Sequence, residues 1–255
     1  MLAAATIEAL ARRLYEAEQE RRPIRPLTQQ YALTLEEAYR VQQVRVALQK
    51  GSPIGYKLGF TSAAMRTQLG IDRPNYGVLL DSMLLTRPQL DCSALIHPRI
   101  EPEVALYVGR SLEGQPAWPA LQAAVEAVYP CLEVVDTRYQ EYVFRLEDNT
   151  ADNSSAARVW LGPPQRWPGP VDLALMGVRL WRNGEEIDRG LGAEAMGHPL
   201  HALQWLVETL TRQGRALPAG SLVLTGGLTR AHPLKPGDTY VAEFGGLGTL
   251  FLSAV

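Results

Sequence analysis

The sequence predicts an α+β protein in which a helical N-terminal segment precedes a β-rich domain. Helical periodicity dominates the first fifth of the 255-residue chain and recurs in two later segments. From Gly55 onward, short apolar runs alternate with glycine and proline, which is typical of strands joined by turns. We therefore assign residues 1–52 to the helical segment and residues 53–255 to the β-rich domain.

Two helices are expected in the N-terminal segment. Thr6 can cap the first, which carries apolar residues at helical spacing until the polar run 18–23 ends it. Thr34 and Glu37 have the spacing of a capping box at the start of the second, and Gly51 stops that helix. Neither helix carries a catalytic constellation, so we expect them to serve packing or contacts between subunits.

Seven strands and two further helices are expected in the β-rich domain. The expected strands cover residues 101–108, 131–136, 156–161, 173–182, 221–225, 239–244 and 248–252. Asn183-Gly184 is typical of a two-residue hairpin turn. The helices are expected over 119–128 and 199–213, and we interpret His198 as the cap of the second rather than as a zinc ligand.

Composition excludes several classes of function. The net charge of -2 argues against nucleic acid as the main partner, because phosphate binding needs a basic face. No apolar run is long enough to span a bilayer, and the N-terminus lacks the pattern of a secretory signal. Cys92 and Cys131 are too few and too far apart to indicate a disulfide framework. We expect a cytoplasmic protein without membrane contact.

Two carboxylates in one expected strand form the most informative pattern. Glu101 and Glu103 are two residues apart, so their side chains point to the same face of the strand. Like charges held that close cost energy unless a cation or a proton neutralises them. Glu133 lies in a second short apolar run. Oxygen ligands of this kind suit magnesium or manganese, although glutamates on half-exposed strands remain an equally simple interpretation.

Three other stretches could carry chemistry, and each has a simpler interpretation. Lys57 lies between glycines in an apolar stretch, so burial would lower its pKa or nearby carboxylates would raise it; a solvated lysine is the alternative. The segment 151–155 could be a ligand-binding turn or a cap. The segment 225–229 could bring backbone N–H groups close to an anion or form a tight turn.

Taken together, the motifs resemble those of a known family. The motifs are G-Y-K-L-G-F-T-S-A-A-M, Y-G-V-L-L-D-S-M, I-H-P-R-I-E-P-E-V-A, C-L-E-V-V-D-T-R-Y, A-D-N-S-S-A and L-T-G-G-L-T. In this order, from about Leu35 to the C-terminus, they resemble the hydratase/decarboxylase family of aromatic meta-cleavage pathways, within the fumarylacetoacetase superfold. The resemblance implies a fumarylacetoacetase-like mixed β-roll core behind the helical segment.

The resemblance also implies a set of site residues. It implies a magnesium or manganese ion bound by three glutamates, one lysine as an active-site acid/base, and further residues that line the substrate pocket. These are Glu101, Glu103 and Glu133 for the metal, Lys57 for proton transfer, and Ser155, Gly226 and Thr229 for the pocket. A metal-dependent lyase acting on a small 2-oxo or 2-hydroxy dienoate is the expected activity.

The finer pattern favours a decarboxylase that converts 4-oxalocrotonate (2-oxo-3-hexenedioate) to 2-hydroxypenta-2,4-dienoate. The segments 136–139 and 225–229 are similar to decarboxylase motifs, and Asn75 stands where pentadienoate hydratases tend to carry an acid. Met65 departs from the decarboxylase pattern, in which lysine is common, and Thr229-Arg230 also resembles the pattern of heptenedioate hydratases. A 2-hydroxypenta-2,4-dienoate or 2-oxohept-3-enedioate hydratase using the same site is therefore the alternative.

A dicarboxylate substrate needs a donor for its second carboxylate. Arg138 and Arg230 are the candidates, because a guanidinium matches a carboxylate in shape and charge. Arg138 could equally pair with Asp136 or another acid and brace the metal-binding strand. The family resemblance further implies a homo-oligomer and a complex with the pathway hydratase. A C–C bond hydrolase is a weaker alternative, because the N-terminal motifs contain no His–Glu pairing. A scaffold subunit without catalysis is also weaker, because the three glutamates and Lys57 are intact.

Overall fold

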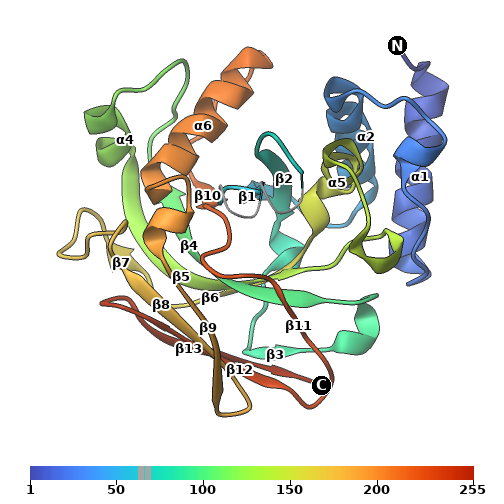
Figure 1. Ribbon diagram of the computed structural model, residues 1–255. Coiled ribbons are helices and arrows are strands. Elements are labelled where there is room, and N and C mark those ends of the chain that lie inside the picture. Colours follow the sequence, from blue (N-terminus) through green and yellow to red (C-terminus); the bar gives the residue numbers. More distant parts are fainter. Residues whose placement is uncertain (63–65, 67–69) are drawn as a thin grey trace.

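The computed structural model describes residues 1–62, 66 and 70–255, and Met65 lies outside the described residues. It contains helices packed against two sheets (Figure 1). The helices are α1 (Ala4–Gln19), α2 (Leu35–Leu48), α4 (Trp118–Ala124), α5 (Leu146–Ala151) and α6 (Pro199–Arg212). The strands are β1 (Pro53–Gly59), β2 (Asn75–Leu80), β3 (Gln89–Leu90), β4 (Arg99–Val108), β5 (Val125–Val135), β6 (Ala156–Leu161), β7 (Gln165–Arg166), β8 (Gly177–Arg182), β9 (Glu185–Leu191), β10 (Ser221–Leu224), β11 (His232–Pro233), β12 (Thr239–Phe244) and β13 (Gly248–Ala254).

The larger sheet carries the elements that matter for function. Its described strands run in the order β2-β1-β10-β4-β5-β6, with β11 beside β4 and β7 beside β5. β1 pairs with β10 in parallel, whereas β10, β4, β5 and β6 pair with one another antiparallel, so the sheet is mixed. β4 and β5 pair along almost their whole lengths and curve across the molecule in Figure 1.

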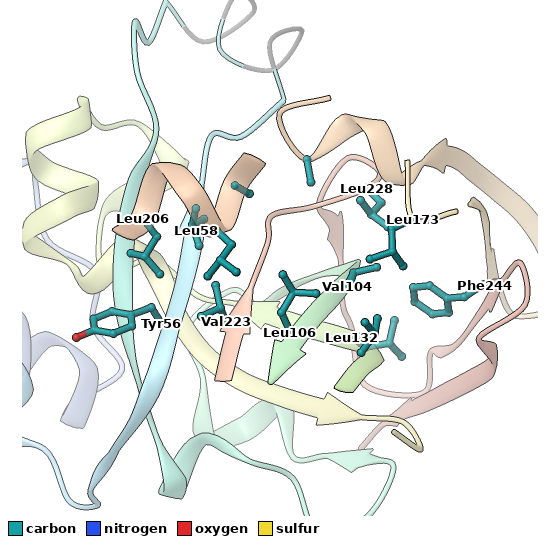
Figure 2. Packing of buried hydrophobic residues seen from close by; sticks show 14 of the residues in the cluster. Tyr56, Leu58, Val104, Leu106, Leu132, Leu173, Leu206, Val223, Leu228 and Phe244 are labelled. Carbon is teal, nitrogen blue, oxygen red and sulfur yellow. The ribbon is translucent and has the colours of Figure 1, made fainter. Parts of the chain in front are cut away.

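The main core lies between this curled sheet, α6 and the smaller sheet. The smaller sheet has the order β3-β13-β12-β8-β9. In Figure 2, Leu206 of α6 lies beside Tyr56 and Leu58 of β1, while Val104 and Leu132 lie on the side toward Phe244 of β12. Apolar residues follow both faces of β4 and β10 because both faces of these central strands are buried. This burial fixes the register of the strands that carry the site.

The helical N-terminal segment forms a second core with part of the β-rich domain. Leu10 and Leu14 of α1 and Val41 of α2 are buried in a cluster that also contains Tyr139 and Ala151. In Figure 1, α1 and α2 lie beside α5, on the opposite side of the molecule from α4. Because α5 leads directly into the segment 153–155, this cluster holds one wall of the site described below.

The fold expected from the motifs is confirmed, with local differences at element ends. Thr34 and Glu37 make both hydrogen bonds of the capping box, and His198 caps α6 by accepting from the backbone of Leu200. The prediction that Thr6 caps the first helix is wrong, because α1 already begins at Ala4. Among the described residues, none of the helices combines the length and apolar character needed to cross a membrane.

The helix expected over 119–128 ends four residues early. α4 stops at Ala124, and Val125 begins β5, which pairs with β4 from its first residue. Valine is β-branched and favours a strand, and pairing with β4 outweighs the helical spacing of the apolar residues. The strand expected over 131–136 is therefore the C-terminal half of a longer strand. The added residues lie at the end of β5 away from Glu133.

Candidate metal centre and active site

Three glutamates meet where β4 and β5 pair. Glu101 lies directly opposite Glu133 in the antiparallel register, and Glu103 lies two residues further along β4. One carboxylate oxygen from each lies within 4.8 Å of the others. Glu103 and Glu133 are 0% and 1% exposed, and Glu101 is half-buried. The strand register thus brings together the three residues that the sequence indicated as ligands.

The buried carboxylates repel one another, and their pKa values show it. Burial and the neighbouring Glu133 raise the pKa of Glu101 to about 7. Burial, Glu133 and Glu101 hold the pKa of Glu103 well above its ordinary value. Like charges opposite each other destabilise a sheet unless something neutralises them. The protein keeps three acids where a cation or protons must balance their charge.

The oxygen atoms of this cluster fit a hard divalent cation. Glu103 Oε2 accepts a hydrogen bond of 2.9 Å from the backbone N–H of Gly226. Glu103 Oε1 and Glu133 Oε1 are buried and have no hydrogen-bond partner among the described residues. Buried carboxylate oxygens without partners are costly, and coordination of a metal ion would satisfy them. An all-oxygen donor set favours magnesium or manganese over zinc.

Lys57 supplies a positive charge at the edge of the cluster. It lies in the middle of β1, is 3% exposed, and places Nζ 3.0 Å from Glu133 Oε2. Burial by itself would lower the pKa of Lys57, but Glu133, Glu101 and Glu103 raise it overall. The sequence left open whether the pKa of Lys57 is lowered by burial or raised by carboxylates, and in the structure the carboxylates have the larger effect. Lys57 is held as an ammonium group that can donate a proton.

A strained turn positions Lys57 from the other side. Asn153, Ser154 and Ser155 are consecutive non-glycine residues with φ of 57°, 52° and 56°. The left-handed conformation costs about 1–2 kcal/mol per residue, so a run of three needs support. Asn153 makes two hydrogen bonds to the backbone of Val78, and the Ser154 hydroxyl donates to Asn75. The result is that Lys57 Nζ donates to the Ser154 carbonyl at 3.1 Å.

A cavity of about 170 Å³ opens above these groups. Lys57 and Glu101 line it, as do Ser155 and Thr229, which the family motifs had indicated. Gly226 is not among the lining residues. It acts from behind through its N–H bond to Glu103, and a side chain there would collide with Thr61. Its neighbour Gly227 takes the lining position.

Neither arginine proposed for a second substrate carboxylate reaches the cavity. Arg138 is 1% exposed, and its guanidinium binds the side chain and the backbone carbonyl of Asp152. This geometry matches the bracing role that was the other interpretation of Arg138, although the partner is Asp152 and not Asp136. Arg230 is exposed and lies 3.1 Å from Asp188. We correct the substrate-binding assignment of Arg138 accordingly.

Several lining residues were not identified from the sequence. They are Arg99 at the start of β4, Tyr142 and Phe144 from the segment after β5, and Asn149 of α5. The position of Arg99 could have been found, since it lies two residues before Glu101 and therefore on the same face of the strand. The aromatic residues gave no such signal, because an irregular segment carries them to the cavity.

Comparison with known proteins agrees with this architecture. The family model described as fumarylacetoacetate (FAA) hydrolase C-terminal matches residues 35–252. The chain therefore belongs to the fumarylacetoacetate hydrolase family and, within it, to the meta-cleavage decarboxylases and hydratases.

Named relatives divide between the two activities. The chain is 37% identical over 248 residues to a 4-oxalocrotonate decarboxylase of Pseudomonas putida, covering 95% of this chain and 94% of the relative. It is 35% identical over 250 residues to a 2-keto-4-pentenoate hydratase of Paraburkholderia xenovorans (strain LB400), covering 95% and 93%. The structure of 4-oxalocrotonate decarboxylase from Pseudomonas putida G7 with magnesium and adipate matches with a TM-score of 0.95 and 34% identity, covering 100% and 99% of the two chains.

Proposed function

We propose that this protein decarboxylates 4-oxalocrotonate to 2-hydroxypenta-2,4-dienoate with the help of Mg²⁺ or Mn²⁺. The observation that carries the proposal is the cluster of three carboxylates beside one lysine at the cavity. Glu101, Glu103 and Glu133 would hold the ion. The similar decarboxylase structure contains magnesium and adipate, a dicarboxylate, which supports both the cation and the substrate class.

The reaction breaks the bond between C5 and C6 of the substrate. CO₂ leaves, and the electron pair of the broken bond moves through the C3=C4 double bond toward the C2 oxygen, which gives a dienolate. A bound divalent cation supplies Lewis-acid stabilisation of the negative charge that develops on this oxygen, an effect worth several kcal/mol. Protonation of the dienolate oxygen then yields the dienol product.

Lys57 is the residue of this chain suited to move that proton. Its raised pKa keeps it protonated at neutral pH, and its two observed partners leave one ammonium N–H available. We propose that Lys57 stabilises the developing oxyanion by a hydrogen bond and donates the proton to it. Ser155 and Thr229 line the same cavity. The Ser155 hydroxyl accepts from Asn149 and keeps its own proton, with which it would orient the carboxylate next to C2.

Hydration of 2-hydroxypenta-2,4-dienoate is the second candidate, because relatives of similar identity are named hydratases. Asn75 argues for the decarboxylase. It is fully buried, and its amide donates to Asn149 and Thr150. By resemblance of the motifs, this amide stands where pentadienoate hydratases tend to carry an acid. Asn75 contacts Asn149, which lines the cavity, and an amide at this position cannot take a proton as a carboxylate would.

Product analysis tests the proposal. The protein with Mg²⁺ is incubated separately with 4-oxalocrotonate and with 2-hydroxypenta-2,4-dienoate, while CO₂ and the dienoate absorbance are followed. We expect CO₂ release from the first substrate and slow or no loss of the second. Efficient hydration of the dienoate without CO₂ release from 4-oxalocrotonate would replace the decarboxylase by the hydratase.

A further inference from the structure

We propose that Arg99, stacked on Tyr142, is the specificity-determining residue that binds the distal carboxylate of a dicarboxylate substrate. This inference rests on the proposed function and deepens it by naming the residue that selects the substrate class. Among the described residues that line the cavity, Arg99 and Lys57 are the two with permanently or stably positive side chains. Lys57 is already paired with Glu133, which leaves Arg99 for a second anion.

Arg99 lies at the right place along the strand. Arg99, Glu101 and Glu103 alternate along β4, so their side chains leave the same face in a row. Residues two apart in a strand are separated by about 6.6 Å. A six-carbon chain whose first carboxylate lies at the glutamate cluster can bridge this spacing to the guanidinium. This face of β4 can therefore bind one end of a small molecule at the metal site and the other end at Arg99.

The guanidinium of Arg99 is available for a ligand. Arg99 takes part in none of the ion pairs of the described residues, and its charge reaches Glu101 only from beyond ion-pair distance, although the half-buried position makes an unpaired cation costly. The nearby acid Asp136 is occupied, because its two oxygens accept the backbone N–H groups of Ile96 and His97. An arginine kept half-buried at a cavity without an acidic partner indicates that an anion completes it.

Tyr142 holds the guanidinium in one orientation. The central carbon of the Arg99 guanidinium lies 3.8 Å from the centre of the Tyr142 ring, which is a cation–π contact. Stacking leaves the in-plane N–H groups of arginine free to bind a carboxylate in bidentate geometry. The Tyr142 hydroxyl lies 3.1 Å from the carbonyl oxygens of both His97 and Val135 and donates its one hydrogen to this pair. The ring and the arginine are thus arranged before any ligand binds.

The backbone at Tyr142 is strained, which supports a ligand-binding role independently of the cation–π contact. Glu141 and Tyr142 are adjacent non-glycine residues with φ of 55° and 58°. Left-handed non-glycine residues persist where surrounding structure enforces them, and they cluster at ligand clamps. Here the strained turn brings the aromatic ring under Arg99 and places Phe144 beside it in the cavity wall. The strain thus has a clear local consequence, which is the platform for the arginine.

We expect Arg99 to contribute to substrate binding and not to the rate of the chemical step. The distal carboxylate loses its charge as CO₂ leaves, so its attraction to Arg99 weakens in the transition state. An interaction that is stronger with the substrate than with the transition state does not accelerate the reaction. Loss of Arg99 should therefore raise KM for the dicarboxylate without lowering kcat.

Direct binding of two inert ligands tests the inference on the Mg²⁺-loaded protein. Adipate carries two carboxylates, and hexanoate has the same chain with one. By isothermal titration calorimetry, wild-type protein should bind adipate more tightly than hexanoate. Arg99→Met should weaken adipate by roughly ten- to hundredfold, the range for a charge-assisted hydrogen bond, and leave hexanoate nearly unchanged. Arg99→Lys should recover part of the loss, since it keeps the charge.

Arg110→Met is the matched control, because Arg110 is exposed just beyond the other end of β4. It should bind both ligands like wild type. Equal weakening of both ligands by Arg99→Met, or no preference for adipate in the wild type, would overturn the inference. Failure of this inference and failure of the decarboxylase proposal give different results. CO₂ release with no effect of Arg99→Met on adipate defeats only this inference, and selective loss of adipate without CO₂ release defeats only the decarboxylase proposal.

Discussion

Replacement of Glu103 by glutamine should raise the stability of the metal-free protein while it removes metal binding. Two carboxylates whose oxygen atoms lie within 4.8 Å of each other repel by about 3.5 kcal/mol or more at an effective dielectric constant of about 20. Glu103 faces two such neighbours, and its attraction to Lys57 offsets about one of them. The net relief is therefore on the order of 3.5 kcal/mol. Glutamine keeps the shape of the side chain and can still accept the N–H of Gly226.

The gain should depend on pH in a defined direction. Burial and the neighbouring glutamates raise the pKa of Glu103, so the folded protein binds this proton more tightly than the unfolded chain does. At low pH the wild-type carboxyl is already neutral and glutamine changes little. As the pH rises through the raised pKa, ionisation destabilises the wild type alone. The stability advantage of Glu103→Gln should therefore grow from pH 5 to pH 8.5.

Thermal unfolding in EDTA and in excess Mg²⁺ measures both effects. Each kcal/mol shifts Tm by about 2–4 °C in a chain of this size, so a rise of several degrees is expected at high pH without metal. The Tm increase on addition of Mg²⁺ should disappear, as should turnover. Glu113→Gln, at an exposed position, is the control and should behave as wild type. A variant that is less stable than wild type at pH 8.5 would refute the repulsion argument, and one that keeps its Mg²⁺ response and activity would refute the metal assignment.

Two further predictions concern proton transfer and metal binding. Lys57→Met should lower kcat by roughly a hundredfold or more without weakening Mg²⁺ binding, and an unchanged kcat in steady-state assays would remove Lys57 from the reaction. Because the pKa of Glu101 is raised to about 7, the cation must displace a proton below that pH. Calorimetric Mg²⁺ affinity should fall as pH decreases through 7, with release of protons to the buffer, and pH-independent affinity between 5.5 and 8 would contradict this coupling.

Much of the fold could be predicted from local signals in the sequence. The capping box at Thr34 and Glu37 and the cap at His198 depend on neighbouring residues, and both are present. The end of α4 could not be predicted in the same way. Val125 belongs to β5 because β4 pairs with it, and that partner is distant in the sequence.

The same division applies to the site. Glu101 and Glu103 could be paired from the period of a strand alone, whereas Glu133 was placed beside them by the register of β4 and β5. Arg138 was assigned from its residue type, and its burial against Asp152 depends on how α5 folds back. Tyr142 contacts Arg99 because of a left-handed turn. This turn contains no glycine, so the sequence offered no signal from which to predict it.

A substrate labelled at C6 distinguishes decarboxylation from hydration. 4-Oxalocrotonate labelled with carbon-13 at C6 is incubated with the Mg²⁺-loaded protein and followed by carbon NMR, with Glu103→Gln as the inactive control. We expect the label to appear in CO₂ and bicarbonate while 2-hydroxypenta-2,4-dienoate without the label accumulates. Retention of the label at C6 in unchanged substrate or in a hydrated dicarboxylate, with active Mg²⁺-loaded protein, would contradict it.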